Sequence, residues 1–168
     1  MTKAIMIIAP KNFQDYEFSD TKKVLEDNGI KVEVASKNVT FAKGVFGGKA
    51  KIDKDISKIN VSEYDAVIFI GGGGASVYLN DSTAFKIAKQ AYEQEKILAA
   101  ICLAPSILAN AGLLEGKNAT AFPTEQKNLE EHGCEYTNES VTVDGRIITA
   151  DGPESAEEFG KTIVNALK

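Results

Sequence analysis

The sequence predicts an α/β fold, a three-layer α/β/α sandwich with a mainly parallel central sheet. Short apolar runs of strand length alternate along the chain with segments whose apolar residues recur at helical spacing. Several of these runs are apolar throughout, which is typical of parallel strands that helices cover on both faces. The 168 residues contain no internal repeat, low-complexity tract or Pro/Ser-rich linker. We therefore expect one domain over residues 1–168.

The first half of the chain is predicted to contain three buried strands, two helices and a hairpin. Asn28-Gly29 can close the first helix, because glycine readily takes the left-handed conformation of a helix cap. Three glycines among β-forming residues favour the hairpin. In order, the predicted elements are strand Lys3–Ala9, helix Phe18–Asn28, strand Ile30–Ala35, hairpin Lys43–Ile52, strand Asp65–Ile70 and helix Ser82–Glu95.

The second half is predicted to contain two further strands, three helices and a second hairpin. Gly112 ends one of the helices, and Asp144-Gly145 is a dipeptide typical of a hairpin turn. In order, the predicted elements are strand Ile97–Ile101, helix Pro105–Ala111, strand Asn118–Phe122, helix Glu125–His132, a hairpin of Ser140–Val143 with Arg146–Ala150, and helix Ser155–Leu167.

The composition argues against several classes of partner. A net charge of -5 and a pI near 5.0 disfavour binding to a nucleic-acid backbone or to an anionic membrane. No apolar run approaches the roughly 20 residues of a membrane-spanning helix, and the N-terminus lacks the pattern of a signal peptide. The two cysteines are too few for a disulfide framework, and with the one histidine they show no metal-ligand spacing. We expect a cytoplasmic protein with reduced thiols, no metal and no cofactor.

Three segments are expected to meet at one edge of the sheet. In open parallel sheets, ligands bind beyond the carboxyl ends of the strands. The segments that follow predicted strands there are the loop Pro10–Glu17, the glycine run 71–74 and the turn at Cys102. The glycine run lacks the Lys-Ser/Thr of a phosphate-binding loop, so close approach of its backbone to the turn is the better interpretation. A flexible turn that needs positive φ angles is the simpler alternative.

Cys102 has the sequence context of a nucleophile elbow, a sharp turn between a strand and a helix. Small residues stand two positions to either side of it, Ala100 and Ala104, and Pro105 suits the first turn of the helix that follows. A thiol in this place faces the positive end of a helix, which predicts a lowered pKa and a reactive thiolate. Most free cysteines are small buried core residues, but this strand–turn–helix context favours a reactive centre.

The same segment resembles the nucleophile segment of the ThiJ/PfpI superfamily, the DJ-one/PfpI proteins. The resemblance covers the whole chain and implies the flavodoxin-like, class I glutamine amidotransferase-like form of the sandwich. The matching segments are Ala100-Ile101-Cys102 with Pro105, Asp15-Tyr16-Glu17-Phe18, Gly71-Gly72-Gly73, Asp144-Gly145, Ile148-Thr149 and Gly152-Pro153.

The resemblance implies that Glu17 lies against the sulfur of Cys102. A carboxyl buried beside a thiolate has a raised pKa, so it can donate a hydrogen bond to sulfur or move a proton. An acidic residue in the first turn of a helix also complements the helix dipole, and this alternative stays open.

Backbone and pocket residues complete the expected site. The N–H groups of Gly72 or Gly73, together with that of Leu103, could stabilise an oxyanion or a cysteine sulfinate. Phe122, at the end of a predicted strand, and Pro153, after the last predicted strand, are expected to line the substrate pocket.

The chain departs from the superfamily in its histidines. Peptidase-like members have a histidine directly after the cysteine, where this chain has Leu103, and others have one in the following strand, where it has Phe122. The only histidine, His132, stands at the end of a predicted helix and is expected to be structural. Peptide-bond cleavage needs a base and an acid, so a peptidase is the least favoured function.

Two other functions remain open from the sequence. Cys102 with Glu17 could process small reactive carbonyl compounds, as the glyoxalase and deglycase-like activities of the superfamily imply. The alternative is a redox-sensing or protective protein without turnover, in which Cys102 oxidises to a sulfinate. The superfamily's dimers and hexamers also imply a homodimer or higher homo-oligomer, with the apolar hairpin tip Val45-Phe46 as a candidate contact.

Overall fold

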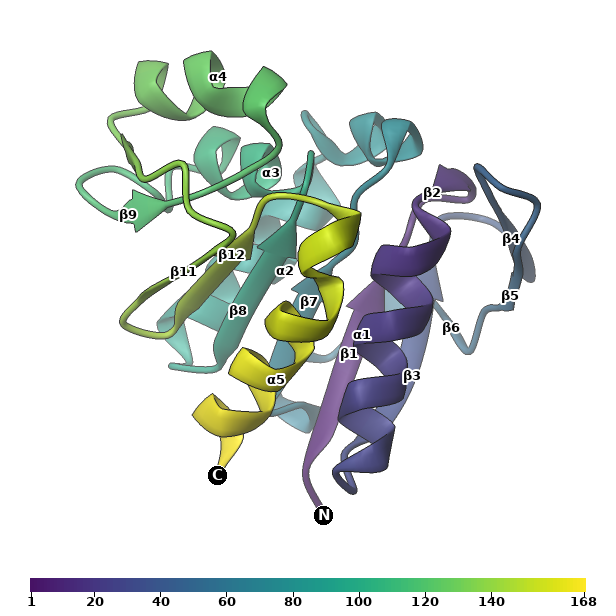
Figure 1. Cartoon of the computed structure of the whole chain (residues 1–168). Coiled ribbons are helices and arrows are strands. Elements are labelled where there is room, and N and C mark those ends of the chain that lie inside the picture. Colours follow the sequence, from purple (N-terminus) through teal and green to yellow (C-terminus); the bar gives the residue numbers. More distant parts are fainter.

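The centre of the molecule is a seven-stranded sheet with the strand order β11-β12-β8-β7-β1-β3-β6. The computed structural model describes all residues 1–168 (Figure 1). Every neighbouring pair of strands in this sheet is parallel except β11 and β12, which form a hairpin. The strands are β1 (Lys3–Ile7), β3 (Lys31–Ser36), β6 (Lys54–Asp55), β7 (Ala66–Phe69), β8 (Ile97–Ile101), β11 (Val141–Asp144) and β12 (Ile147–Ala150).

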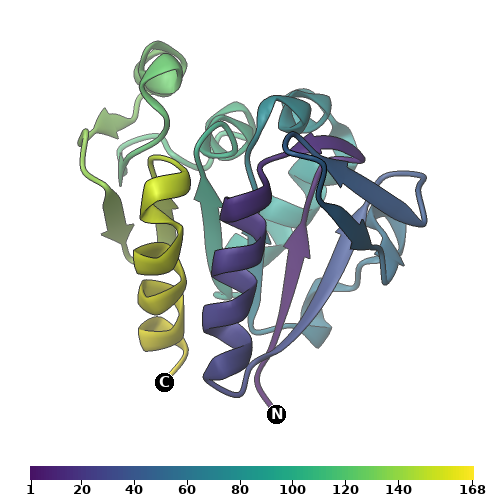
Figure 2. The same cartoon turned by 45° about the vertical axis from the view of Figure 1, so that its right-hand side comes forward.

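Helices cover both faces of the sheet, which confirms the predicted α/β/α sandwich. Helices α1 and α5 lie side by side on one face (Figures 1 and 2), while α2 and α3 cover the other. The short helix α4 packs against α3 beyond the sheet. The bounds are α1 (Asp15–Asp27), α2 (Ser82–Glu93), α3 (Pro105–Asn110), α4 (Gln126–Glu131) and α5 (Ala156–Leu167).

Alternate residues of each central strand belong to two separate hydrophobic cores, one on each face of the sheet. In β1, Ile5 and Ile7 belong to the core beneath α2 and α3, whereas Ala4 and Met6 belong to the core beneath α1 and α5. All four side chains are fully buried. Successive residues of a strand point to opposite faces, so a strand covered on both faces must be apolar at every position. This is why the strands appear in the sequence as unbroken apolar runs.

Helix α1 carries part of the candidate site and is fixed by close packing on α5. A Cβ atom on Gly160 of α5 would lie 3.0 Å from Cβ of Val24, so a larger residue there would require Val24 to shift by a few tenths of an ångström. The Thr21 hydroxyl of α1 donates to the carbonyl of Ala156 at 3.4 Å. The contact of these two helices therefore sets the position of the first turn of α1 above the sheet.

Helix α1 begins three residues before the predicted start at Phe18. Gln14 caps it, because its Oε1 accepts a hydrogen bond from the N–H of Glu17 at 2.8 Å. The residues of this first turn are mostly polar and did not extend the apolar spacing on which the prediction was based. At the other end, Asn28 is the cap and Gly29 has φ 78, as predicted.

The predicted strand Asn118–Phe122 was wrong in length and place. Only Asn118–Ala119 is a strand, β9, and it pairs with β10 (Glu135–Tyr136) outside the central sheet. The backbone beyond β9 bonds to other partners: the N–H of Thr120 donates to Oγ1 of Thr149, and that of Phe122 donates to the carbonyl of Cys102, both at 2.9 Å. The segment therefore ties the elbow to its surroundings instead of extending a sheet.

A second, three-stranded sheet lies beside the first. It consists of β2 (Lys11–Phe13), which was not predicted, and the predicted hairpin of β4 (Phe41–Gly44) with β5 (Lys49–Lys51). Asp15 holds the hairpin tip against α1, because its carboxylate accepts hydrogen bonds from the N–H groups of Phe46 at 2.9 Å and Gly48 at 2.8 Å. None of the helices is both long and apolar enough to cross a bilayer.

Candidate functional site

Cys102 occupies a strained turn between β8 and α3. Its φ is 65°, a left-handed conformation that is uncommon for a residue other than glycine. The N–H of Cys102 donates to the carbonyl of Ala150 at 2.9 Å, which ties the turn to β12. Ala100 and Ala104 are fully buried on either side of it. The structure therefore has the elbow geometry that the sequence predicts, with a partly exposed thiol at its apex.

Glu17 brings a fully buried carboxyl to this thiol from the first turn of α1. The carboxyl is hydrogen-bonded to the side chain of Cys102, and its Oε1 accepts the N–H of Gly71 at 3.0 Å. The other oxygen, Oε2, is buried and has no hydrogen-bond partner. No lysine or arginine pairs with this carboxyl. The thiol is therefore its closest chemical partner.

The glycine run makes room for this contact. A Cβ atom on Gly71 would lie 2.7 Å from both Cβ of Cys102 and Oε1 of Glu17. Gly72 has φ 102, and a Cβ there would lie 2.5 Å from the carbonyl oxygen of Asn12. The N–H groups of Gly72 and Leu103 donate hydrogen bonds to the Cys102 sulfur. Two backbone dipoles thus point at the sulfur atom.

The remaining candidate residues lie around the site at different distances. Gly73 is exposed and lines a neighbouring hollow rather than contacting Cys102. Phe122 is 41% exposed, and its ring lies 3.6 Å from where a Cβ on Gly152 would stand, directly before Pro153. These two segments therefore approach each other next to the elbow. Gln14 was missed, although a polar residue three positions before Glu17 is a capping signal.

Burial raises the pKa of Glu17 to about 7, and the hydrogen bonds from Cys102 and Gly71 offset only part of this effect. Burial also raises the pKa of the Cys102 thiol, and the neighbouring Glu17 carboxylate raises it further. The N–H groups of Gly72 and Leu103 act in the opposite direction. Above about pH 7 the pair therefore carries one negative charge and one proton, which lies between carboxyl and sulfur.

The lowered thiol pKa predicted from the helix dipole was wrong. Helix α3 has only six residues, so its dipole is small, and the thiol is partly buried beside an acidic side chain instead of a cation. Sequence reasoning placed Glu17 at the sulfur but took no account of the effect of its charge on the thiol.

The single histidine and the second cysteine lie apart from this pair. His132 caps the end of α4, where its Nδ1 lies 2.8 Å from the carbonyl oxygen of Asn128. It is not among the hydrogen-bond partners of Cys102. Cys134 is 5% exposed, and burial, followed by the Glu135 charge, raises its pKa to about 11. Neither residue supplies a base to Cys102 within one chain.

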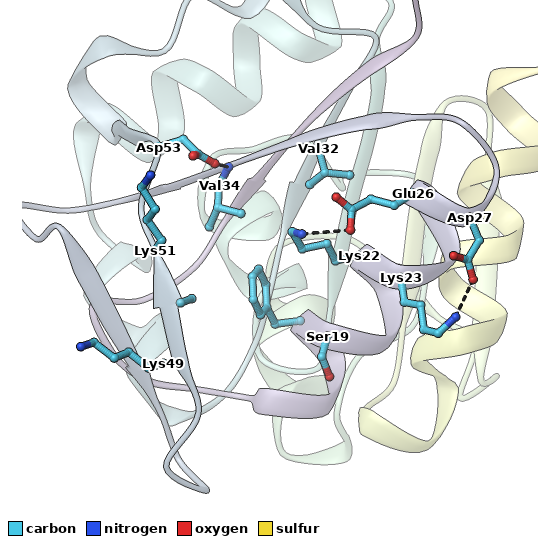
Figure 3. A pocket seen from close by; sticks show the side chains of 12 residues that line it. Ser19, Lys22, Lys23, Glu26, Asp27, Val32, Val34, Lys49, Lys51 and Asp53 are labelled. Carbon is cyan, nitrogen blue, oxygen red and sulfur yellow. Dashed lines mark hydrogen bonds and ion pairs between the residues drawn. The ribbon is translucent and has the colours of Figure 1, made fainter.

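The largest surface hollow is also separate from Cys102. It lies between α1, β3 and β5 (Figure 3), and some of its charged side chains form ion pairs with one another. Lys22 pairs with Glu26 at 2.9 Å and Lys23 with Asp27 at 2.6 Å, as the dashed lines in Figure 3 show. Asp53 accepts the backbone N–H of Val34 at 2.9 Å. Lys49 and Lys51 also line the groove and take part in no ion pair.

Comparison with known proteins identifies the family to which this elbow belongs. The sequence model described as the DJ-1/PfpI family matches residues 2–166. The chain belongs to the DJ-1/PfpI family. Its fold matches the crystal structure of a ThiJ/PfpI domain protein from Brachyspira murdochii with a TM-score of 0.96 and 33% identity, covering 98% of this chain and 95% of that one.

Two relatives in the family span nearly the whole chain. The protein MJ0967 of Methanocaldococcus jannaschii, described as uncharacterized, is 38% identical over 99% of this chain and 82% of its own length. The Bacillus subtilis protein named "Putative cysteine protease YraA" is 33% identical over the full length of both. These names assign no chemistry to Cys102 and Glu17, which is argued from the site.

Alkylation of Cys102 by iodoacetamide is expected to accelerate with a midpoint near pH 7, set by Glu17. Loss of the carboxyl proton of Glu17 leaves a carboxylate that can accept the remaining thiol proton as sulfur attacks. In Glu17→Gln this base is absent, so the midpoint should move above the ordinary thiol value of about 8.5. Mass spectrometry of the labelled peptides measures both rates, with Cys134 in the same digest as the control. Equal midpoints in the two proteins would contradict the coupling.

Proposed function

We propose that this DJ-1/PfpI protein processes small reactive carbonyl compounds, in the manner of a glyoxalase or deglycase, through Cys102 and Glu17. The observation that supports this most strongly is the hydrogen bond between a partly exposed thiol and a buried carboxyl whose pKa is about 7. A group with a pKa near neutrality both accepts and returns protons at neutral pH. Reduced thiols, which a cytoplasmic protein would keep, are required for this chemistry.

The first step is addition of the thiol to an aldehyde. The sulfur forms a bond to the carbonyl carbon, the Glu17 carboxylate accepts the thiol proton, and the carbonyl oxygen then takes that proton to give a hemithioacetal. The N–H groups of Gly72 and Leu103, which donate to the sulfur, hold negative charge on it before attack. The addition consumes no oxidant or reductant.

The second step moves a proton within a 2-oxoaldehyde substrate. Glu17 removes the proton from the hemithioacetal carbon and returns it to the adjacent carbon, while the hemithioacetal hydroxyl proton passes to the ketone oxygen. The ketone thereby becomes an alcohol, and the sulfur-bearing carbon becomes a thioester. Water then cleaves the thioester to release a 2-hydroxy acid and restore the thiol. The net reaction adds one water molecule, and the internal oxidation and reduction balance.

Loss of methylglyoxal is expected to depend on both side chains. Cys102→Ser removes the nucleophile and Glu17→Gln the proton carrier, so each should lower kcat/KM by about 100-fold or more. Cys134→Ala is the matched control and should retain wild-type activity, because this buried thiol lies outside the site. Substrate loss and formation of the hydroxy acid are measured together. Unchanged activity in the Cys102 or Glu17 variant would refute the proposal.

The N–H groups directed at sulfur also support a second candidate, oxidation sensing without turnover. Two molecules of hydrogen peroxide, each reduced to water, oxidise a thiol in two-electron steps to a sulfenate and then a sulfinate. The donors from Gly72 and Leu103 and a protonated Glu17 would bond to the sulfinate oxygens.

Mild peroxide treatment should add two oxygens to Cys102 before it modifies Cys134. Cys102 is partly exposed and has hydrogen-bond donors on its sulfur, whereas Cys134 is 5% exposed. Intact-protein and peptide mass spectrometry over a peroxide series gives both rates, and Glu17→Gln should shift the product towards fully oxidised sulfonate. Equal oxidation of the two cysteines would count against a sensing role.

Peptidase activity is the least supported function, although one relative carries the name of a cysteine protease. A leaving amine must receive a proton, and the histidine that would give it is absent from the hydrogen-bond partners of Cys102. Glu17, already bonded to the thiol and to Gly71, would have to serve both as base and as acid.

We also propose that the chain forms a homodimer or a higher homo-oligomer through an apolar patch beside the site. The patch consists of Tyr16, Val45 and Phe46, which are 54%, 49% and 67% exposed. The rings of Tyr16 and Phe46 lie 5.7 Å apart, and the Asp15 hydrogen bonds keep the hairpin tip in place. A rigid, exposed aromatic pair of this kind is typical of protein contact surfaces.

Phe46→Glu is expected to shift the protein towards the monomer. A charge in the centre of an apolar contact would be buried without a partner, so association should weaken at least tenfold. Val143→Glu, an exposed apolar position on β11 at the other edge of the sheet, is the matched control. Sedimentation velocity over a concentration series measures the change. A wild-type protein that stays monomeric, or a Phe46→Glu variant that associates like the wild type, would contradict the patch.

A further inference from the structure

A second hollow, of about 460 Å³, opens beside the glycine run, and Cys102 is not among the residues that line it. It lies at the point where the chain changes direction in the sheet, because β1 stands between β3 and β7 and the loops after β1 and β7 diverge there. Ligands of open α/β sheets bind at such points. The residues that line it are Pro10, Lys11, Asn12, Val39, Phe41, Lys43, Gly73, Gly74, Ser76 and Val77.

The only charged residues in this hollow are lysines, and they belong to a row across the three-stranded sheet. Lys11 of β2 is the register partner of Lys43 of β4, which is the register partner of Lys49 of β5. Residues in register point to the same face of a sheet, and all three are exposed. None of them takes part in an ion pair.

Three unneutralised lysines in register are unfavourable for the empty protein. Like charges directly opposite each other on neighbouring strands repel and destabilise the sheet. The chain as a whole has five more acidic than basic residues, yet none of those acids lines this hollow. In the groove of Figure 3, which also contains glutamate and aspartate side chains, Lys22 and Lys23 have carboxylate partners. Lys49, which belongs to the row, also lines that groove and has none. An anion bound between Lys11 and Lys43 would remove the repulsion.

The walls of the hollow are apolar and accessible. Phe41 is 49% exposed and Val77 is 45% exposed, and Val39 and Pro10 add further apolar surface. The ammonium group of Lys49 lies 4.3 Å from the centre of the Phe41 ring, which holds that ring beside the lysine row. A site with cations on one side and apolar walls on the other suits a small molecule with an anionic head and an apolar body.

We propose that this hollow binds a small organic anion, a phosphate or carboxylate attached to a short apolar group. Lys11 and Lys43 would bind the anionic head, and Phe41, Val39 and Val77 would pack on the apolar part. The proposal does not depend on turnover at Cys102. The two places are nevertheless joined by consecutive residues, because the N–H of Gly72 bonds to the Cys102 sulfur while Gly73 and Gly74 line the hollow.

Phenyl phosphate is the probe, titrated into the full chain at constant ionic strength with calorimetry and with amide NMR. Binding should shift the amide signals of Gly73 and Gly74, and the double variant Lys11→Gln/Lys43→Gln should weaken it at least about tenfold. Lys31→Gln is the matched control, because Lys31 is exposed and unpaired at the far end of β3. Without ligand, the double variant should unfold no earlier than the wild type, since it loses only a repulsion.

Three comparisons decide the outcome. Phenyl phosphate should bind at least about fivefold more tightly than inorganic phosphate, and phenol should not bind, if both the charges and the apolar walls contribute. Equal affinity for phenyl phosphate and inorganic phosphate would overturn the proposed apolar contact. Equal affinity in the wild type and the double variant would overturn the site. An oligonucleotide or polyglutamate that displaces the probe at far lower concentration would assign the lysine row to a macromolecule instead.

Discussion

The hydrogen bond between the Glu17 carboxyl and the Cys102 thiol is the contact on which the arrangement of the site depends. It joins two segments from distant parts of the chain, the start of α1 and the turn after β8. The contact requires a glycine at position 71, because any side chain there would occupy the space between the two groups. It also requires α1 to begin at Asp15, where the Gln14 cap places Glu17 in the first turn and directs its carboxyl inward.

The absence of a cation near Glu17 decides the chemistry of this contact. A carboxylate beside a lysine or an arginine would stay ionised and would be a poor acceptor for a thiol proton. Burial without a cation instead brings the pKa of Glu17 to about 7, so the carboxyl changes its protonation state within the physiological range. The same burial keeps the neighbouring thiol protonated until a partner accepts its proton. Both proposed uses of the site would therefore involve proton transfer between these two groups.

Much of the fold could be predicted from the sequence, because strands buried on both faces leave unbroken apolar runs. The elbow at Cys102 could also be predicted, because the small residues on either side of it and Pro105 are signals in the local sequence. The strand β2, the end of β9 and the lysine row could not be predicted in this way. They depend on pairings between separate segments of the chain, such as Lys11 with Lys43. Short polar strands carry no periodic signal of their own.

Predictions about individual atoms in the site were less complete. The resemblance placed Glu17, Gly72 and Leu103 around the sulfur, and the structure brings these three to it. Gly73 was grouped with them. In the structure Gly73 begins the 3-10 helix Gly73–Tyr78 and lines the neighbouring hollow instead. The predicted direction of the shift in the Cys102 thiol pKa was also wrong. This shift depends on burial and on the charge of Glu17, and the spacing of residues in the sequence gives no information on either.

The backbone conformation at Cys102 is unfavourable for any residue that has a side chain. At φ 65° a glycine would be relaxed, whereas a side chain at this angle costs about 1 kcal/mol or more. Architecture alone would therefore favour glycine at position 102, with a sheet and helices that fold as well or better. The surrounding sheet, helix and hydrogen bonds therefore hold Cys102 at a free-energy cost that a glycine at the same position would not have.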